Sequence, residues 1–281
     1  MKTKHEVLRR RALAPGIVDI VVRAPLVARK AEPGQFVMVM ADERGERIPL
    51  TLVDWSREEG WIEMVFLEVG VSTKKLSALR EGQEIYHVAG PLGNPSKIER
   101  YGRVAVVGGG VANAALYPIA RALRGLGNEV IAVVGARSSS LLVFEEKLSE
   151  FCDEVHVATD DGSRGFKGFV SQLLDELMGE GLELDAVWIV GPALMMRACA
   201  QVAAKRGVPV AYASLNPIMV CGMGMCGACR VKVGGRVRFT CVEGPEFDAY
   251  AVDWEDLIRR LGAFRDQEGL SLRLYSEAKR A

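Results

Sequence analysis

Four of the six cysteines in this 281-residue chain crowd into one C-terminal segment, with the spacing of ligands for a metal cluster. Cys221 and Cys226 are separated by four residues, Cys226 and Cys229 by two, and Cys229 and Cys241 by eleven. The C-x4-C-x2-C…C pattern is that of plant-type 2Fe-2S sites, in which four thiolates hold two irons. The sequence therefore predicts a 2Fe-2S cluster with these four cysteines as its ligands.

The residues around the cysteines suit such a loop. Gly222, Gly224 and Gly227 allow the backbone to fold tightly and leave amide N–H groups that can point at sulfur, which tunes the potential of a cluster. Residues 231–237 are expected to form a hairpin that returns the chain with the fourth ligand. A zinc site stays open as the alternative, although zinc knuckles usually pair two C-x2-C units and this segment has one.

The other cysteines and the histidines carry weaker signals. Cys152 and Cys199 lie alone in helical patterns and are expected to be small buried hydrophobes. His5, His87 and His156 are scattered along the sequence and are interpreted as incidental. No residue is therefore predicted to be catalytic in the acid–base sense.

Glycine-rich turns form a second group of signals. Gly108-Gly109-Gly110 ends an apolar run and precedes a helical pattern, so its amides could face a pyrophosphate. The G-x-G-x-x-G pattern fails at Asn113, and close packing of a strand and a helix explains such glycines about equally well. Residues 159–163 and 191–192 follow two further predicted strands, at the edge where ligands bind in open α/β sheets.

The elements that would position these residues fall into two halves. Residues 1 to about 98 are expected to be β structure, with strands at 16–23, 35–40, 61–67 and 84–89 and a short helix at 73–79. Several short strands with regular turns are typical of a small antiparallel barrel.

After a Gly- and Pro-rich boundary at 90–95, apolar strands alternate with helices. Strands are predicted at 103–108, 129–135, 154–159, 186–191 and 208–214, and helices at 112–126, 141–152, 169–178 and 193–206. This alternation predicts right-handed βαβ units and a five-stranded parallel sheet. Residues 249–281 are expected to form one or two terminal helices.

Composition narrows the possible classes of protein. Hydrophobic residues make up 49% of the chain, which excludes wholesale disorder. Lys plus Arg and Asp plus Glu are both 36, and this neutral balance gives no electrostatic reason to bind nucleic acid or a membrane surface. No run reaches the roughly 18 apolar residues that span a bilayer, and residues 1–11 lack the apolar core of a signal peptide. A cytoplasmic location is therefore expected.

The combined motifs resemble the ferredoxin-NADP reductase superfamily over nearly the whole chain. The cysteine segment, from Ser214 through 221–231 to 241–248, is similar to the small subunits of NADH-dependent ferredoxin:NADP oxidoreductases, also known as sulfide dehydrogenase small subunits. The electron-transfer subunits of dihydroorotate dehydrogenase B are close relatives of these. The resemblance implies an FAD-binding barrel (1–98), an NAD(P)-binding α/β domain (99–214), a 2Fe-2S segment (215–248) and a helical tail (249–281).

The resemblance also implies roles for individual residues. It assigns FAD binding to Arg47, Pro49, Leu50, Thr51, Gly70, Ser72 and Thr73, with Arg47 at the pyrophosphate and Thr51 beside the isoalloxazine. It assigns NAD(H) or NADP(H) binding to Gly108, Gly109, Gly110, Arg137, Asp160, Asp161, Gly162, Gly191 and Pro192.

The implied function is electron transfer from NAD(P)H through FAD and the 2Fe-2S cluster to a larger partner. That partner would be a flavin and iron-sulfur subunit related to the glutamate synthase small subunit, and the heterodimer could bifurcate electrons between NADPH and ferredoxin. The tail at 249–281 is the candidate docking element. Nicotinamide preference stays open.

Two departures from the family pattern keep other interpretations open. Many of these small subunits carry Asp where this chain has Cys221, and an all-cysteine site favours the dihydroorotate-linked relatives. Ala112 and Ala115 stand where the family has Gly and Pro, and a methyl at Ala112 is expected to crowd a phosphate. These alanines motivate a third interpretation, a redox relay subunit without its own nicotinamide turnover.

Overall fold

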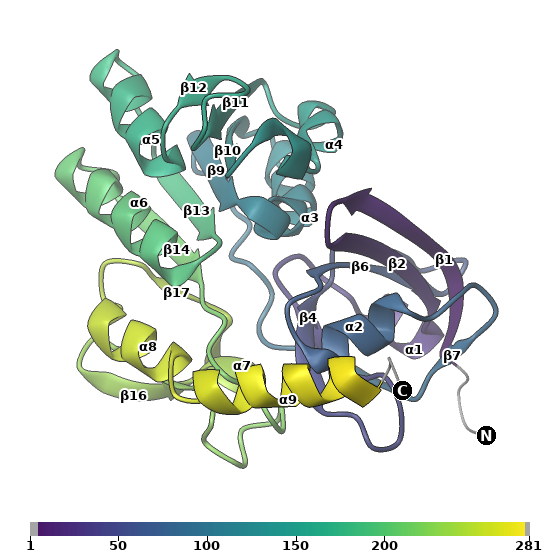
Figure 1. Cartoon of the computed structure of the whole chain (residues 1–281). Coiled ribbons are helices and arrows are strands. Elements are labelled where there is room, and N and C mark those ends of the chain that lie inside the picture. Colours follow the sequence, from purple (N-terminus) through teal and green to yellow (C-terminus); the bar gives the residue numbers. More distant parts are fainter. Residues whose placement is uncertain (1–4, 279–281) are drawn as a thin grey trace.

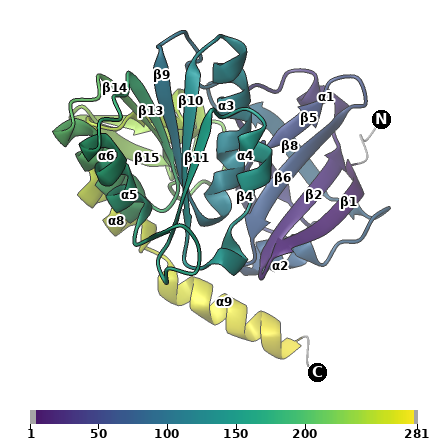
Figure 2. The same ribbon diagram turned by 90° about the horizontal axis from the view of Figure 1, so that it is seen from above.

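The computed structural model describes residues 5–278, which form a β barrel beside a sheet that is covered by helices on both faces. Figure 1 shows the barrel next to this α/β unit, with the C-terminal helices running beneath both. In Figure 2 helices α5 and α6 lie on one face of the sheet, and α3 and α4 lie on the other face, between the sheet and the barrel. The predicted fold class, a barrel plus an α/β domain, is confirmed.

Two antiparallel sheets make the barrel. In the described residues their orders are β5-β6-β2-β1-β7 and β4-β3-β8. The strands are β1 (His5–Ala14), β2 (Ile17–Arg23), β3 (Phe36–Met40), β4 (Arg47–Thr51), β5 (Asp54–Ser56), β6 (Trp61–Leu67), β7 (Glu84–Ile85) and β8 (His87–Leu92). The helices are α1 (Pro25–Ala28) and α2 (Val71–Ser77). Because the chain crosses from one sheet to the other at Tyr86, the single strand predicted at 84–89 is divided in two.

Strand β1 was not predicted, because its sequence is rich in charge. In the structure Arg11 lies opposite Asp19 of β2, and the Arg11 Nη2 to Asp19 Oδ2 distance is 2.7 Å. Arg9 reaches the same carboxylate at 3.2 Å. These cross-strand ion pairs bring two guanidinium groups to Oδ2 of a fully buried aspartate, whose Oδ1 has no hydrogen-bond partner, and they allow a charged segment to form part of the barrel wall.

The α/β sheet has the order β12-β11-β10-β9-β13-β14-β17 in the described part of the chain. The strands that were predicted are present and parallel: β9 (Arg103–Gly109), β10 (Glu129–Ala136), β11 (Glu154–Thr159), β13 (Ala186–Val190) and β14 (Val210–Ser214). Two strands too short to give a sequence pattern extend its edges, β12 (Phe166–Lys167) and the antiparallel β17 (Glu246–Asp248). The strand order reverses between β9 and β13, which makes their carboxyl ends the expected ligand crevice.

Helices cover this sheet. They are η1 (Gly110–Ala112), α3 (Asn113–Gly125), η2 (Ser139–Leu141), α4 (Glu145–Ser149), α5 (Val170–Gly179) and α6 (Ala193–Lys205). Helix α4 is much shorter than the predicted 141–152. Phe144 precedes it with a φ of 65°, a left-handed backbone conformation that interrupts a helix.

The C-terminal part contains the predicted hairpin and two helices. Strands β15 (Arg230–Val233) and β16 (Arg236–Phe239) are joined by Gly234 and Gly235, whose φ values of 56° and 73° suit a two-residue hairpin turn. Helices α7 (Thr240–Glu243), α8 (Trp254–Leu261) and α9 (Arg265–Ala278) follow. Residues 279–281 of the predicted tail lie outside the described residues. Within residues 5–278, no helix combines the length and the apolar character needed to cross a bilayer.

Apolar contact and ion pairs join the barrel to the α/β domain. Ile17, Val53 and Val65 of the barrel form one buried cluster with Ala114 and Val143. Lys147 of α4 donates to Glu63 of β6 at 3.1 Å, and Arg121 of α3 donates to Asp54 at 2.9 Å. Burial, and then the neighbouring charge of Asp19, raise the pKa of Glu63, whereas Lys147 opposes this shift.

Replacing Lys147 should destabilise this interface. We expect Lys147→Met to cost roughly 1–3 kcal/mol, because it removes the closer of the two cations of a buried carboxylate and leaves only Arg9, at 3.3 Å. Lys205→Met, which removes an exposed pair with Asp175, should change stability by less than about 0.5 kcal/mol. Thermal unfolding of the two variants measures the difference.

The same comparison has a pH dependence of definite sign. A carboxyl whose pKa is raised on folding favours the folded state as pH falls. The deficit of Lys147→Met should therefore shrink as the pH is lowered through the raised pKa of Glu63. A deficit that stays constant over acidic pH would show that the ionised form of Glu63 is not the group that Lys147 stabilises.

Candidate functional site

The four clustered cysteines lie in the segment between β14 and β17 and form two pairs. Cys229 and Cys241 are buried, with 3.3 Å between their sulfurs. Cys221 and Cys226 lie closer to solvent, and the Cys226 amide is 3.5 Å from the Cys221 sulfur. Two irons with four thiolate ligands need two thiolates each, so the pairs match the donor set of a 2Fe-2S cluster.

Backbone amides point at three of these sulfurs. The amide of Met223 is 3.4 Å from Cys221 Sγ, that of Gly224 is 3.1 Å from Cys241 Sγ, and that of Ala228 is 3.5 Å from Cys226 Sγ. The expected role of the glycines is visible here, because Gly222, Gly224 and Gly227 all have positive φ, at 74°, 79° and 67°.

Cys221 and Cys241 differ in how readily their thiols lose a proton. Hydrogen bonds from the amides of Cys226 and Met223 lower the pKa of Cys221 to about 6. Burial raises the pKa of Cys241 to about 12. Burial also raises the pKa of Cys152 and of Cys199 to about 12. Cys199 is fully buried in α6 as predicted, whereas Cys152 is only half-buried and lies beyond the end of α4.

The donor geometry suits a two-iron cluster better than zinc. Within the described residues, no three histidine, cysteine or acidic side chains gather closely enough to hold one metal ion. A structural zinc site needs four ligands on one ion. Paired sulfurs with surrounding amide donors are what a cluster of two irons requires.

The cysteine loop packs against the barrel. Cys229 and Cys241 share a buried cluster with Phe36 and Met38 of β3. A Cβ atom on Gly222 would lie 2.5 Å from Cγ of Met38, so glycine is required for this close approach. Met38 in turn pairs with Pro49 on β4, the strand that carries the predicted flavin residues.

The predicted flavin residues occupy β4 and the start of α2. Arg47, at the beginning of β4, is exposed and has no carboxylate partner among the described residues, which leaves its charge available to a phosphate. Leu50 is buried in the barrel core, and Pro49 and Thr51 are half-buried. At the second segment, Thr73 Oγ1 accepts from the amides of Val69 and Gly70 at 3.1 and 3.0 Å, and Ser72 is buried.

The predicted nicotinamide residues lie at the carboxyl ends of the parallel strands. A Cβ on Gly191 would lie 3.5 Å from the backbone nitrogen of Gly109, so the two glycine turns meet at the point where the strand order reverses. Met195 lies over both, and added Cβ atoms would be 2.5 Å from its sulfur at Gly109 and 2.9 Å at Gly191. Packing thus accounts for these two glycines, whereas Gly110, with a φ of 63°, faces open space.

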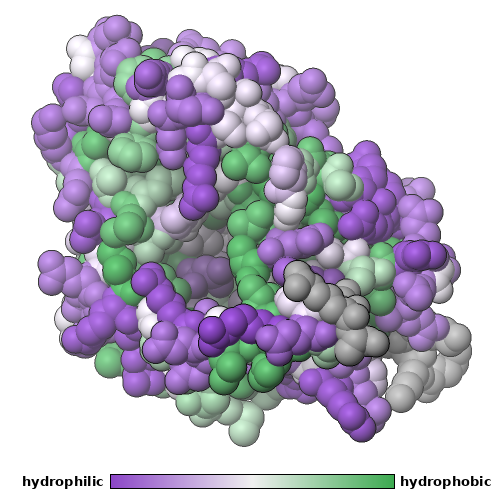
Figure 3. Space-filling view, in the orientation of Figure 1, coloured by the Kyte–Doolittle hydropathy of each residue, from purple (hydrophilic) through white to green (hydrophobic). Residues whose placement is uncertain are grey.

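The neighbouring loops are fixed by backbone hydrogen bonds. The amide of Asp160 donates to Ala136 O at 3.1 Å, and that of Asp161 donates to Arg137 O at 3.2 Å. Arg137, Asp160, Asp161, Gly162 and Pro192 are all exposed at this edge of the sheet. Figure 3 shows the centre of this face of the molecule hollowed between the α/β domain, the barrel and the C-terminal helices.

Sequence reasoning missed two residues beneath the glycine turns. Asn113 is fully buried, and its Nδ2 donates to Gly135 O at 3.2 Å, so it ties the start of α3 to β10. Met195 closes the space over Gly109 and Gly191. A polar residue at the start of an otherwise apolar helix was the available signal for Asn113. Ala112, expected to crowd a phosphate, is half-buried and packs against the edge of the α/β core.

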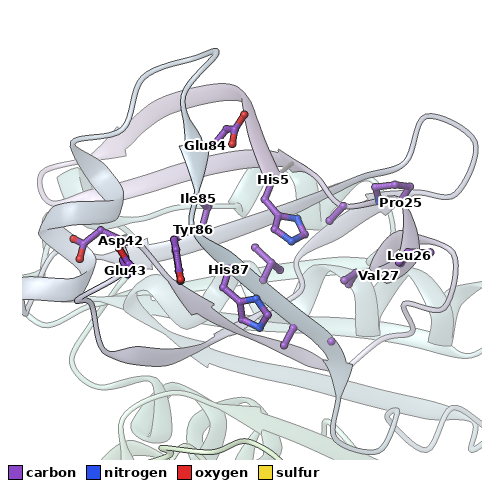
Figure 4. Close-up of a pocket in the computed structure, with 15 residues that line it drawn as sticks. His5, Pro25, Leu26, Val27, Asp42, Glu43, Glu84, Ile85, Tyr86 and His87 are labelled. Carbon is purple, nitrogen blue, oxygen red and sulfur yellow. The ribbon is translucent and has the colours of Figure 1, made fainter. Parts of the chain in front are cut away.

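The histidines are less scattered than their sequence positions suggested. His5 and His87 line one cavity of about 730 Å³ on the barrel (Figure 4). Burial lowers the pKa of His5. The cavity is lined by α1, β8 and neighbouring residues, and none of the predicted cofactor residues contributes to it.

Comparisons with known proteins place these features in a family. Residues 216–253 match the iron-sulfur cluster binding domain of dihydroorotate dehydrogenase B. A Thermotoga maritima protein named dihydroorotate dehydrogenase B (NAD(+)), electron transfer subunit homolog, is 48% identical over 95% of this chain and 94% of its own length. The electron transfer subunit of dihydroorotate dehydrogenase B from Desulforamulus reducens is 34% identical over 86% of this chain and 95% of its own.

One solved structure is similar to this chain over almost the entire length of both. It is that of the NADH-dependent reduced ferredoxin-NADP oxidoreductase, described for insights into flavin-based electron bifurcation. The two chains superpose with a TM-score of 0.92 and are 45% identical, and the match covers 98% of this chain and 99% of the other. With the paired cysteines, the barrel and the α/β sheet, these similarities show that the chain belongs to the family of dihydroorotate dehydrogenase B electron transfer subunits and their homologues.

Proposed function

We propose that this chain is the electron-transfer subunit of an oxidoreductase, in which it binds FAD, a 2Fe-2S cluster and NAD(P)H. The observation that carries the proposal is the seating of the paired cysteines on the sheet that contains Arg47 and Thr51. The proposed division is a flavin barrel at 1–98, a nucleotide domain at 99–214, a cluster segment at 215–248 and a tail at 249–281.

The residues would share the work as follows. A bound FAD would supply the conversion between the two-electron chemistry of a nicotinamide and the one-electron chemistry of an iron-sulfur cluster. Arg47 would neutralise phosphate charge, and the β4 backbone around Thr51 would hold the flavin ring. The turn at Gly110 and the loops at Arg137 and at 160–162 would orient the nicotinamide nucleotide at the reversal of strand order.

Few structural elements lie between the proposed flavin site and the proposed cluster site. Pro49 lies opposite Met38 in neighbouring strands, and Met38 contacts the cysteine loop at Gly222. A single strand thus separates the two sites. This rigid contact fixes their separation, as electron transfer between two cofactors requires.

A partner subunit would receive the electrons at the exposed side of the cysteine loop. Several large apolar side chains there face solvent: Val220, Met223, Met225 and Val242. Met225 is 81% exposed. Methionine-rich apolar surface of this kind marks a protein interface. The proposed partner is a larger flavin and iron-sulfur subunit, similar to the glutamate synthase small subunit, that supplies a route to ferredoxin.

One second candidate has a specific observation in its favour. The all-cysteine ligand set and the names of the relatives favour a subunit that serves dihydroorotate oxidation. Purification of the natural complex distinguishes the two, because a partner that oxidises dihydroorotate would replace the bifurcating partner. The relay interpretation, a subunit without its own nicotinamide turnover, stays a third candidate, and reduction by NADH or NADPH decides it.

An anaerobic visible spectrum tests the central proposal. We expect flavin bands and broad iron-sulfur absorption in the purified chain, and bleaching of both by NADH or NADPH. Cofactor bands that neither nucleotide bleaches would make the chain a relay. If the chain shows no iron-sulfur absorption after incubation with iron and sulfide, the proposal that it binds a 2Fe-2S cluster is wrong.

Arg47 should be needed for flavin affinity. Arg47→Gln removes a charge-assisted phosphate contact worth about 1.5–3 kcal/mol, so FAD should bind roughly 10- to 150-fold more weakly. Fluorescence titration of the flavin-stripped chain measures this. Arg29→Gln, at an exposed arginine elsewhere on the barrel, is the control and should leave the affinity unchanged.

The contact of Gly222 with Met38 should be needed for the cluster. Gly222→Ala would place a Cβ 2.5 Å from Met38 at a positive φ, so iron and acid-labile sulfide per chain should fall sharply. Gly234→Ala has similar backbone strain, with a φ of 56°, but nothing within 4 Å. If both variants lose the same amount of iron, the loss is caused by backbone strain and not by the contact of residue 222 with Met38.

A further inference from the structure

Arg260, on helix α8, contacts the cysteine loop from outside it. Its Nη2 donates to the carbonyl oxygen of Ala228 at 3.2 Å, and Ala228 lies between Cys226 and Cys229. The amide of Ala228 is 3.5 Å from Cys226 Sγ. Ala228 therefore accepts a hydrogen bond from Arg260 through its carbonyl oxygen and donates one to the predicted ligand Cys226 through its amide.

Helix α8 is itself firmly placed. Leu257 is buried against the α/β core, and the Asp253 side chain caps the helix by accepting from the amide of Asp256 at 3.0 Å. The Trp254 indole donates to Ala249 O at 3.2 Å. Because these contacts fix the helix, they also fix the position of Arg260 beside the loop.

The charge of Arg260 has no local counterpart. Its Nε is buried without a hydrogen-bond partner, and within residues 5–278 no carboxylate lies within ion-pair distance of its guanidinium. The neighbouring cations differ in this respect, since Arg259 pairs with Asp256 and Lys232 lies near Asp253 and Asp256. An unpaired guanidinium that is partly buried is costly unless an anion nearby offsets it.

We propose that Arg260 is a positioning residue for the cluster, which holds the Ala228 segment and places a positive charge beside the iron-sulfur group. Four thiolates and two sulfides outweigh the charge of the irons, so this group is an anion. On reduction it gains one electron from the flavin and one unit of negative charge, with no bond made or broken. A fixed cation beside it favours the reduced state.

This inference rests on the proposed function and extends it beyond the recognised cluster domain. The match to the iron-sulfur domain family ends at residue 253, before α8 begins at Trp254. Arg260 therefore lies outside the segment that defines the family's cluster domain. The C-terminal tail would tune the cluster as well as serve in docking.

The experiment compares the cluster potential in the full-length chain with that in three variants. EPR-monitored redox titration gives the midpoint potential of the wild type, Arg260→Gln, Arg260→Lys and the control Arg259→Gln. Arg260→Gln should shift the reduction equilibrium about tenfold towards the oxidised form, about 59 mV for one electron. Arg260→Lys, which keeps the charge but not the fork geometry, should shift it less, and Arg259→Gln should not shift it.

The outcomes separate this inference from the proposed function. An unchanged potential in Arg260→Gln, with iron and sulfide equal to wild type, would overturn the inference. If Arg260→Gln does not retain the cluster, a second neutral variant, Arg260→Met, decides, and a wild-type potential in that variant overturns the inference. A wild-type chain with no 2Fe-2S signal would overturn the proposed function itself.

Discussion

The seating of the cysteine loop on strand β3 is the contact on which the rest of the arrangement depends. The loop leaves the α/β sheet at Ser214 and returns to it at Glu246, and these two residues pair across β14 and β17. The Leu215 amide closes the base of the loop by donating to Pro245 O at 2.9 Å. The loop therefore belongs to one domain and rests on the other, and any relative movement of the domains would strain it.

Helix α3 imposes a second constraint of the same kind. Its first turns supply Ala114 to the interdomain apolar cluster, and Arg121 further along pairs with Asp54 of the barrel. The open turn at Gly110 immediately precedes it. The helix that follows the proposed nucleotide turn is therefore the same element that joins the two domains.

The sequence was most informative where a periodic pattern or a fixed spacing carried the signal. The parallel strands, the β15–β16 hairpin and the position of the glycines beside the cysteines were all predicted from the sequence. The division of the four cysteines into a buried and an exposed pair was not, because burial depends on where β3 lies. Strand β1 was missed because the partner of its arginines, Asp19, is recognisable only after the strands are paired. Arg260 gave no sequence signal, since only the packing of α8 brings it to Ala228.

The two sulfur pairs have different surroundings, so the two sides of the loop differ in how well they stabilise negative charge. Cys229 and Cys241 lie among apolar side chains of the barrel, where burial penalises negative charge. The sulfurs of Cys221 and Cys226 accept from backbone amides and lie towards solvent. In a chain that carries a cluster at this loop, added negative charge is therefore more stable on the side away from the barrel. That side also carries the exposed Met223 and Met225, so electrostatics would draw an electron from the proposed flavin strand towards the proposed partner surface.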